Sequence, residues 1–168
     1  MPSEIFLPFI TVKPHYRSEA DLSAELLTYW MNEPRQLRPQ MRADQCLVDY
    51  AKSKAYDIAN HNLPSGHVDS QGRNTNQAVR EFGCPIPDWY PNDMNCLESL
   101  GYNYPDLPRL FDAFWQSRHH QAHVFATDVF WKPHVRMGCW NYVNTDLQQG
   151  EWIRLWVLVS APEESESP

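Results

Sequence analysis

Three polar segments between residues 66 and 125 carry the side chains best suited to chemistry. The first holds His67, the second Glu98, and the third, which follows Trp115, holds His120. Each lies at the end of a segment with helical or turn character, so side chains far apart in the sequence could meet in one cleft. Two imidazoles and a carboxylate with an open position suit a divalent metal such as zinc. We therefore predict a cleft formed by His67, Glu98 and His120.

Two kinds of activity fit such a cleft. A bound metal would lower the pKa of its water, which could then attack an amide or ester; alternatively Glu98 acts as the base. In the other interpretation the three side chains hydrogen-bond loop backbone and shape a polar cleft. The sequence contains no Gly-rich phosphate loop, Ser/His/Asp order or Cys/His pair. We expect no organic cofactor and no covalent nucleophile.

Two further polar residues are candidates for the cleft. Asp69 lies two positions from His67 and could orient that imidazole, but capping the turn at residues 70–72 is the favoured role. His123 follows His120 by three residues, so on a helix the two would share a face and His123 could be a fourth ligand. A buried histidine satisfied by backbone is the favoured alternative.

Trp89 and Tyr90 form an aromatic pair in a polar loop. Aromatic faces beside polar groups suit stacking against sugar rings or peptide prolines. The same two rings could instead fill the core from the loop. Both interpretations stay open.

Composition limits the class of protein. With 168 residues and 42% apolar content, the chain fits one compact domain. The formal charge of -7 and the lack of a Lys/Arg cluster argue against nucleic acid as a partner. The first ten residues are acidic, split by Pro8 and too short for a membrane span, so we expect no export signal and no transmembrane segment.

Four cysteines could form up to two disulfides, and none has a CxxC spacing. Free buried thiols and a single bridge are both compatible with this number. For a single bridge, Cys84 and Cys96 are the favoured pair.

Three helices are predicted from apolar spacing and capping residues. The first begins at Ser18 and ends before Pro34, the second spans about 41–60, and the third follows the cap Asp106. Between residues 61 and 95 the periodicity vanishes, which predicts a long loop that builds a binding surface.

Two β-rich runs, at about 135–143 and 152–160, predict an antiparallel hairpin. The second run has apolar side chains on both faces, so we expect helices on either side of a small sheet. The predicted divisions are an extended arm (1–17), a domain (18–160) and an acidic, mobile tail (161–168).

The order of these segments resembles the CAP family, also called SCP or PR-1-like, in its lean bacterial form. The resemblance spans about residues 20 to 160. It identifies the family's first histidine with His67, its Glu-Asn-Ile with residues 98–100, its Ser-Pro-Gly-His-Arg with residues 117–121, and its hairpin glycine with Gly138. This resemblance implies a mixed α/β (α+β) fold: an α-β-α sandwich with a small antiparallel sheet and a histidine- and glutamate-lined cleft.

The match departs from the family pattern around the cleft. Leu97 replaces a glycine, Arg118 and His119 replace Pro-Gly, and Gln121 replaces an arginine. These changes affect the rim of the cleft more than its framework. The second family glutamate has no counterpart, because Ser117 stands at about its place.

Three functions follow as alternatives. The first is a binding or adhesion module for an extended ligand, such as a cell-wall glycan, peptide or lipid, with or without metal. The second is a metal-dependent hydrolase of peptidase or esterase type. The third is a structural component of a larger extracellular or virion assembly with protein neighbours. The resemblance favours a secreted or particle-associated location. The expected absence of an export signal does not agree with that location.

Overall fold

A four-stranded sheet forms the centre of the molecule in this computed structural model, which describes residues 17–63, 66–143 and 154–163. The strand order is β1-β3-β4-β2, with β3 and β2 antiparallel to β4 and β1 parallel to β3. The predicted hairpin is confirmed as the β3–β4 pair, whereas the parallel β1 strand was not expected. The strands are β1 (Arg42–Ala43), β2 (Glu98–Tyr102), β3 (Arg136–Val143) and β4 (Arg154–Ala161).

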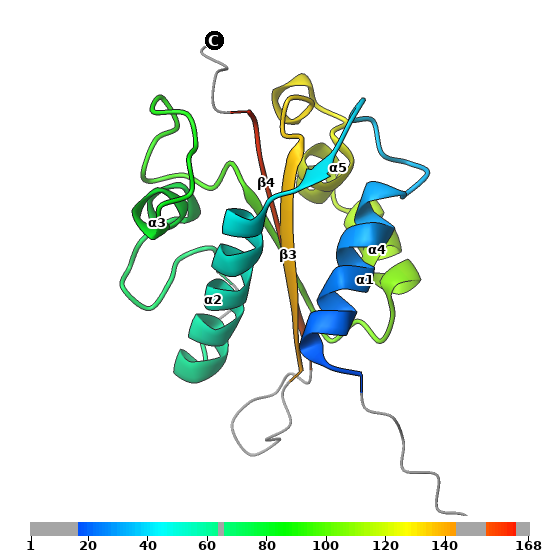
Figure 1. Cartoon of the computed structure of the whole chain (residues 1–168), viewed down its shortest axis with the longest axis horizontal. Helices are drawn as coiled ribbons and strands as arrows, with labels where there is room; N and C mark the ends of the chain where they lie inside the picture. Colours follow the sequence, from blue (N-terminus) through cyan, green and yellow to red (C-terminus); the bar gives the residue numbers. More distant parts are fainter. Residues whose placement is uncertain (1–16, 64–65, 144–153, 164–168) are drawn as a thin grey trace, which may run out of the picture.

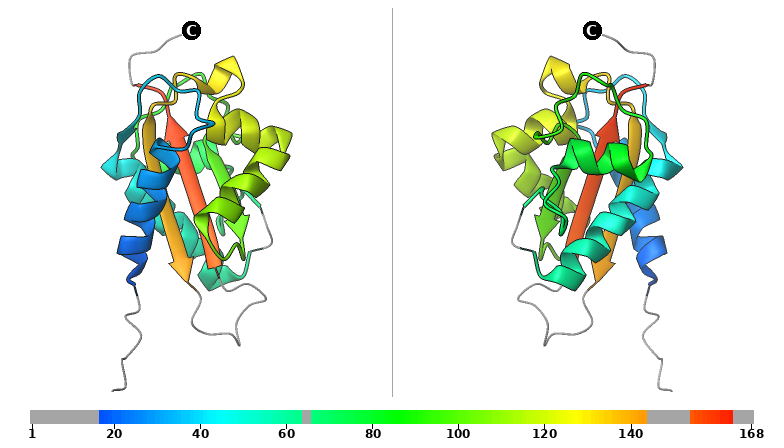
Figure 2. Two further views of the ribbon diagram at one scale, coloured as in Figure 1. Left: turned by 90° about the vertical axis from the view of Figure 1, so that its right-hand side faces the viewer. Right: turned by 90° about the vertical axis from the view of Figure 1, so that its left-hand side faces the viewer.

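Helices cover both faces of this sheet, as predicted. Figure 1 shows α2 and α3 on one side and α1, α4 and α5 on the other, and the two views in Figure 2 show each layer from the front. The mixed α+β sandwich implied by the resemblance is therefore confirmed. The helices are α1 (Glu19–Met31), α2 (Gln45–His61), α3 (Thr75–Phe82), α4 (Leu107–Gln116) and α5 (Arg118–Phe125), with a short 3-10 turn at Val129–Trp131.

Strand β4 divides the core into two apolar clusters. Leu155, Val157 and Val159 pack toward α2 and α3, while Trp156 and Leu158 pack toward α1, α4 and α5. All five side chains are buried. Because side chains alternate along a strand, this apolar run fills both layers.

The first and third predicted helices begin at the expected caps. Ser18 Oγ accepts from the Asp21 backbone N–H at 3.1 Å and the Asp21 carboxylate returns the contact, which completes a capping box. Asp106 Oδ1 accepts from the Arg109 N–H at 2.9 Å, and Pro108 occupies the first turn of α4. Local sequence therefore determines both helix starts.

The second helix begins later than the predicted residue 41. Residues 42 and 43 pair with Arg136 and Met137 as strand β1, and Asp44 then caps α2 by accepting from the Leu47 N–H at 3.1 Å. Asp44 Oδ2 also pairs with buried Arg136 at 2.7 Å. One carboxylate thus ends the strand and starts the helix.

Besides β1, three further elements were missed or misread from the sequence. The long loop predicted for residues 61–95 contains α3, which directs Ala78 and Val79 into the core. Glu98 opens strand β2 and does not lie at the end of a helix or turn. A separate helix, α5, follows Ser117, so His120 and His123 share one helix.

Gly138 allows α2 to lie directly against β3. A Cβ atom at this position would come within 2.2 Å of the Leu47 carbonyl carbon. Real Cβ contacts are not that short, so a side chain here would push helix and strand apart. The glycine matched to the family hairpin therefore has a packing role.

The cysteine pairing differs from the prediction. Cys46, in the first turn of α2, forms a disulfide with Cys84, just beyond α3, while Cys96 and Cys139 are buried and unpaired. The favoured Cys84–Cys96 pair is wrong because Cys84 packs beside the N-terminal turn of α2. The bridge closes the segment that carries His67 and α3.

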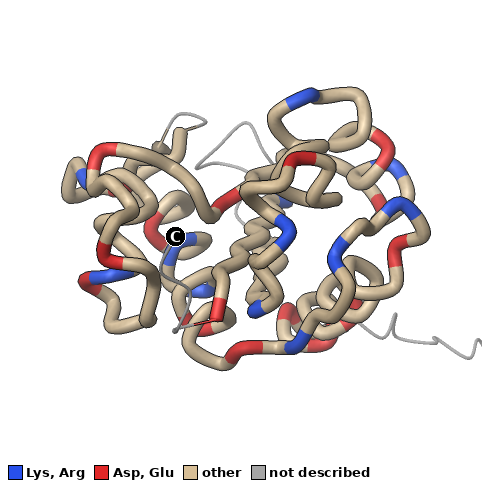
Figure 3. Tube along the Cα trace, turned by 90° about the horizontal axis from the view of Figure 1, so that it is seen from above, with Lys and Arg blue, Asp and Glu red and all other residues tan. Residues whose placement is uncertain are grey.

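The predicted arm (1–17) lies almost entirely outside the described residues, as does the end of the tail. At the boundary, β4 extends to Ala161, which is buried, and Glu163 pairs with Arg42 at 2.8 Å. Lys and Arg positions are interspersed with Asp and Glu positions along the trace (Figure 3). No helix within the described ranges has the length and apolar content that crossing a bilayer requires.

Candidate functional site

The three residues predicted to meet, His67, Glu98 and His120, line one cavity of about 300 Å³. We call it the β2 cleft, because it lies at the start of edge strand β2. Ser99, His123 and Trp131 also line it. The fold thus gathers side chains from the loop after α2, from β2, from α5 and from the short turn after α5.

Strand alternation distributes these side chains to the two layers. Successive residues of a strand point to opposite faces. Glu98 therefore contacts His67 and Thr75 on the α2/α3 side, whereas Ser99 contacts His123 on α5. The cleft spans the edge of the sheet and combines groups from both layers.

Glu98 is the buried acidic group of the cleft. Its Oε1 lies 2.9 Å from His67 Nδ1 and 3.4 Å from Thr75 Oγ1. Asn95 fixes the backbone, because its Oδ1 accepts from the Glu98 N–H at 2.9 Å and its Nδ2 donates to the Glu98 carbonyl at 2.9 Å. Glu98 Oε2 is buried and has no hydrogen-bond partner among the described residues.

His67 is held in place through its backbone. Its carbonyl oxygen accepts from Lys54 Nζ and from Thr75 Oγ1, both at 3.2 Å. With Nδ1 facing Glu98, the other ring nitrogen, Nε2, points away from that carboxylate. The His67 side chain is 37% exposed, whereas that of Glu98 is fully buried.

His120 is the half-buried imidazole on the opposite side of the cleft. Its ring packs on Phe114 with a centroid distance of 4.7 Å. Burial lowers the pKa of His120, and the neighbouring His67 and His119 lower it further. His120 is therefore a neutral, weakly hydrated hydrogen-bonding group near pH 7. His119 is exposed.

His123 is buried, and both of its ring nitrogens make hydrogen bonds within the protein. Its Nδ1 lies 2.7 Å from Ser99 Oγ and its Nε2 lies 2.9 Å from Ser160 Oγ. Burial and the nearby Arg38 guanidinium hold its pKa well below the usual value. Both ring nitrogens are occupied by hydroxyl groups, so His123 does not serve as a fourth metal ligand.

The donor types of the cleft suit a divalent metal, but their arrangement does not. Among the residues that the structure describes, no group of three His, Cys, Asp or Glu side chains is placed to hold a metal ion. His67 Nδ1 is turned to Glu98, whereas His120 belongs to α5, a helix on the other face of the sheet (Figure 1). We therefore derive no chemical step through a metal.

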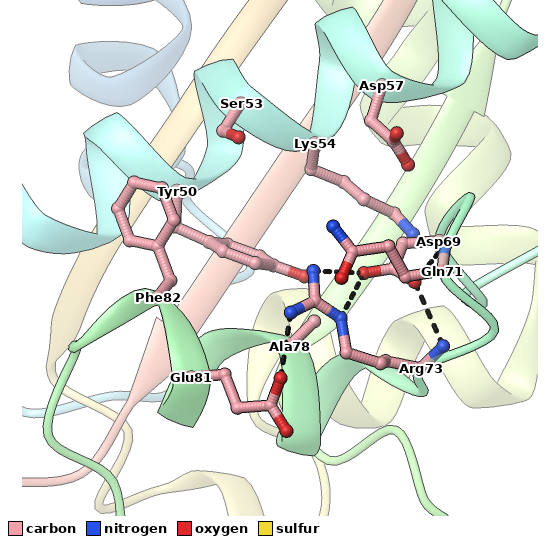
Figure 4. A pocket seen from close by; sticks show the side chains of 10 residues that line it. All are labelled: Tyr50, Ser53, Lys54, Asp57, Asp69, Gln71, Arg73, Ala78, Glu81 and Phe82. Atoms are coloured by element: carbon pink, nitrogen blue, oxygen red, sulfur yellow. Dashed lines mark hydrogen bonds and ion pairs between the residues drawn. The ribbon is translucent and has the colours of Figure 1, made fainter.

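Asp69 lines a second cavity, of about 200 Å³, between α2 and α3 (Figure 4). Its Oδ1 accepts from the N–H groups of Gln71 at 3.0 Å and Arg73 at 2.9 Å, which is the predicted turn-capping role. Arg73 joins Asp69 at 2.7 Å to Glu81 at 2.8 Å across the cavity. The alternative in which Asp69 orients the His67 ring is not what the structure shows, because Glu98 takes that position.

The aromatic pair is divided between core and surface. Tyr90 is 3% exposed, and its Oη lies 2.7 Å from His134 Nε2. Trp89 is 47% exposed and stacks edge-on against Tyr90 with a centroid distance of 4.5 Å. Neither ring lines the β2 cleft. Tyr90 fills the core from the loop, while Trp89 remains a surface aromatic.

Ser99 and Trp131 are among the cleft-lining residues that sequence reasoning missed. Trp131 fixes its indole by donating from Nε1 to the Cys96 carbonyl at 2.9 Å. Ser99 stands where the family pattern has asparagine, which was a signal for a polar group facing the cleft. Nothing in the sequence around Trp131 distinguishes it from a core aromatic.

The sequence itself gives no family assignment, since no protein-family model and no curated protein matches it. Solved structures do match. An outer surface protein from Borrelia burgdorferi superimposes with a TM-score of 0.55 at 18% identity, over 84% of this chain and 90% of that chain. An extracellular protein containing an SCP domain from Bacillus anthracis gives 0.58 at 10% identity, and a cysteine-rich secretory protein from Staphylococcus aureus gives 0.54 at 14%.

The chain has the CAP fold. The last two matches each cover 84% of this chain, which spans 42% and 40% of those two longer chains. At such low sequence identity the structural similarity establishes the fold and not the activity, which has to be inferred from the residues of the cleft. The CAP fold accounts for the convergence of His67, Glu98 and His120 at one end of the sheet.

Proposed function

We propose that this CAP-fold chain is an extracellular binding module whose β2 cleft takes a segment of an extended glycan. The observation that carries the proposal is the buried oxygen Glu98 Oε2, which has no partner among the described residues. A buried polar atom without a partner is costly, and a ligand that donates a hydrogen bond to it recovers that cost. Sugar hydroxyl and amide N–H groups supply such donors.

The remaining walls of the cleft combine polar and apolar groups. The lining includes imidazoles, the Ser99 hydroxyl and the Asn95 amide, and beside them Cys96 and Leu97, a mixture that suits the hydroxyl groups and the apolar face of a sugar ring. Trp131 adds one aromatic side chain, and aromatic rings pack against the apolar face of a pyranose. The volume of about 300 Å³ lies at the lower end of typical ligand pockets and fits part of a larger chain.

The disulfide supports an extracellular location. Bridges such as Cys46–Cys84 form and persist in oxidising compartments. The similar structures include proteins described as extracellular or as outer surface proteins. A module working at or beyond the cell surface would meet cell-wall glycan directly.

Isothermal titration with the β-1,4-linked tetramer of N-acetylglucosamine tests the proposal. Glu98→Gln keeps the shape of the side chain but removes the charge, so we expect the association constant to fall by about tenfold or more, as for hydrogen bonds to charged groups. Glu81→Gln makes the same change on the exposed face of α3 and should leave binding unchanged.

Two results would overturn the binding module. The first is a wild-type protein that does not bind the tetramer, or a Glu98→Gln variant that binds it equally well. The second is shortening of the tetramer detected by mass spectrometry, which would assign hydrolysis to the cleft. Equal binding of a tetra-alanine peptide would assign a peptide as the ligand.

A further inference from the structure

A chain of buried hydrogen bonds leads from the β2 cleft into the core. It runs from Ser99 through His123 and Ser160 to His134 and ends at Tyr90. All five residues are at least about nine-tenths buried: Ser99 is 1%, His123 4%, Ser160 0%, His134 0% and Tyr90 3% exposed. Hydroxyl and imidazole groups can each donate or accept a hydrogen bond. Once the donor is known at one end of this series of hydrogen bonds, the donor in each of the other bonds follows.

One end of the series is fixed by a backbone carbonyl. His134 Nδ1 lies 3.1 Å from the carbonyl oxygen of Ser160, which can only accept. His134 Nδ1 therefore carries the hydrogen. Its Nε2, at 2.7 Å from Tyr90 Oη, is the acceptor of the tyrosine O–H.

Among the residues that the structure describes, the Ser160 hydroxyl has one possible acceptor. Its Oγ faces His134 Nδ1 at 3.3 Å and Arg38 Nη2 at 3.4 Å, both of which are donors. The third neighbour, His123 Nε2, lies 2.9 Å away. The Ser160 hydrogen must therefore go to His123 Nε2.

His123 then donates toward the cleft. Burial beside the Arg38 cation keeps the imidazole neutral, in line with a pKa well below the usual histidine value, and burial lowers the pKa of His134 to about 3. A neutral His123 that accepts at Nε2 has its only ring hydrogen on Nδ1. That hydrogen is donated to Ser99 Oγ at 2.7 Å.

Ser99 therefore keeps its own hydrogen for another partner. Its Oγ contacts no further group in the described part of the chain, and the residue lines the cleft next to Glu98. The same arrangement means that His123 cannot remove the Ser99 hydrogen as a base, because Nδ1 already carries one.

We infer that Ser99 is a specificity-determining residue that donates its hydroxyl hydrogen to an oxygen acceptor of the ligand. Glu98 Oε2, one residue away, requires a donor, so these two neighbouring residues of β2 together offer one donor and one acceptor to a ligand. An amide group supplies both complements in one unit. The inference rests on the proposed glycan-binding function and names its ligand class as a glycan with acetamido groups.

The histidine tautomers test the inference without any ligand. Long-range ¹H–¹⁵N correlation spectra of the wild-type protein should show both His123 and His134 protonated at Nδ1 only. A His123 protonated at Nε2 would overturn the inference whatever the protein binds. This readout is independent of whether the β2 cleft is a glycan site.

Binding supplies the second test, arranged as a double-mutant cycle between protein and ligand. The N-acetylglucosamine tetramer carries acetamido groups, and the glucose tetramer with the same β-1,4 linkage carries hydroxyls instead. Ser99→Ala should weaken binding of the first by about fivefold and leave binding of the second unchanged. Ser99→Thr, which retains the hydroxyl, should restore at least part of the lost affinity.

Each outcome of the double-mutant cycle either supports or overturns the assignment of an acetamido group as the ligand of Ser99. An equal loss for both tetramers, or no loss for either, overturns the acetamido assignment. If the wild-type protein binds neither tetramer, the ligand class is overturned together with the proposed function. Thermal unfolding of Ser99→Ala and Ser99→Thr confirms that both variants are folded before binding is compared.

Discussion

Removal of the Cys46–Cys84 disulfide should loosen the segment that carries the first histidine of the β2 cleft. The bridge ties the first turn of α2 to the residue after the C-cap of α3. Between these two points lie His67, the turn at Asp69 and the whole of α3. The perturbation is the double variant Cys46→Ser/Cys84→Ser, or reduction of the wild-type protein.

The expected cost follows from the length of the closed loop. The two cysteines are 38 residues apart, and a cross-link over such a loop restricts the unfolded chain by about 4 kcal/mol in the chain-entropy description. Single domains have a total free energy of unfolding of about 5–15 kcal/mol. The loss would therefore be a large share of the stability.

Urea unfolding followed by tryptophan fluorescence measures this cost. The midpoint of the double variant, and of the wild-type protein in TCEP, should fall by more than about 1 M relative to the oxidised wild type. TCEP should not affect the double variant further, because Cys96 and Cys139 are unpaired. A wild-type midpoint that TCEP leaves unchanged would refute the reasoning.

Two other predictions concern stability. In the folded protein the pKa of His134 is about 3, and that of His123 lies well below its usual value. Below pH 6.5 the unfolded chain therefore binds more protons than the folded one. The free energy of unfolding should be at its full value above pH 6.5 and should fall by about 1.4 kcal/mol per pH unit for each histidine below it. Urea unfolding at pH 7, 6 and 5 measures this slope, and a free energy of unfolding that is constant or rises toward pH 5 would contradict it. Gly138→Ala should destabilise the protein by about 3 kcal/mol, because the new methyl would meet the Leu47 backbone at 2.2 Å. Gly101→Ala should cost less, because its methyl would meet the end of the movable Leu110 side chain at 2.4 Å. Thermal denaturation ranks the two variants, and the reverse order would show that the α2–β3 contact is not the tighter one.

The parts of the fold that depend on local sequence were predictable. Ser18 and Asp106 are side-chain caps followed by apolar residues at helical spacing, so both helices were placed at the right residues. Strand β4 was recognised because its alternating apolar residues need two covering layers. In each case the information lies within one continuous segment.

The missed elements depend on partners far along the chain. Residues 98–102 form a strand because they pair with Leu155 to Val159 of β4, and nothing in their own composition requires it. Helix α3 is only eight residues long, and its cap residue Asn74 makes no side-chain cap hydrogen bond. The disulfide joins residues 38 apart, and four cysteines allow three pairings that sequence alone does not separate.

The site was predictable in its residue types and less so in its hydrogen-bond directions. His67, Glu98 and His120 were identified from spacing and resemblance, and they line one cavity. The role of Ser99 depends on Ser160 of β4 and on residues beyond it in the core, so it follows only from the assembled structure.

The most direct measurement of the central claim is a crystal structure of the protein with the N-acetylglucosamine tetramer. We predict electron density for the sugar in the β2 cleft, with an acetamido N–H within hydrogen-bond distance of Glu98 Oε2 and the acetamido oxygen within hydrogen-bond distance of Ser99 Oγ. Sugar bound at another surface, with Glu98 Oε2 still without a partner, would contradict the claim that this cleft is the binding site.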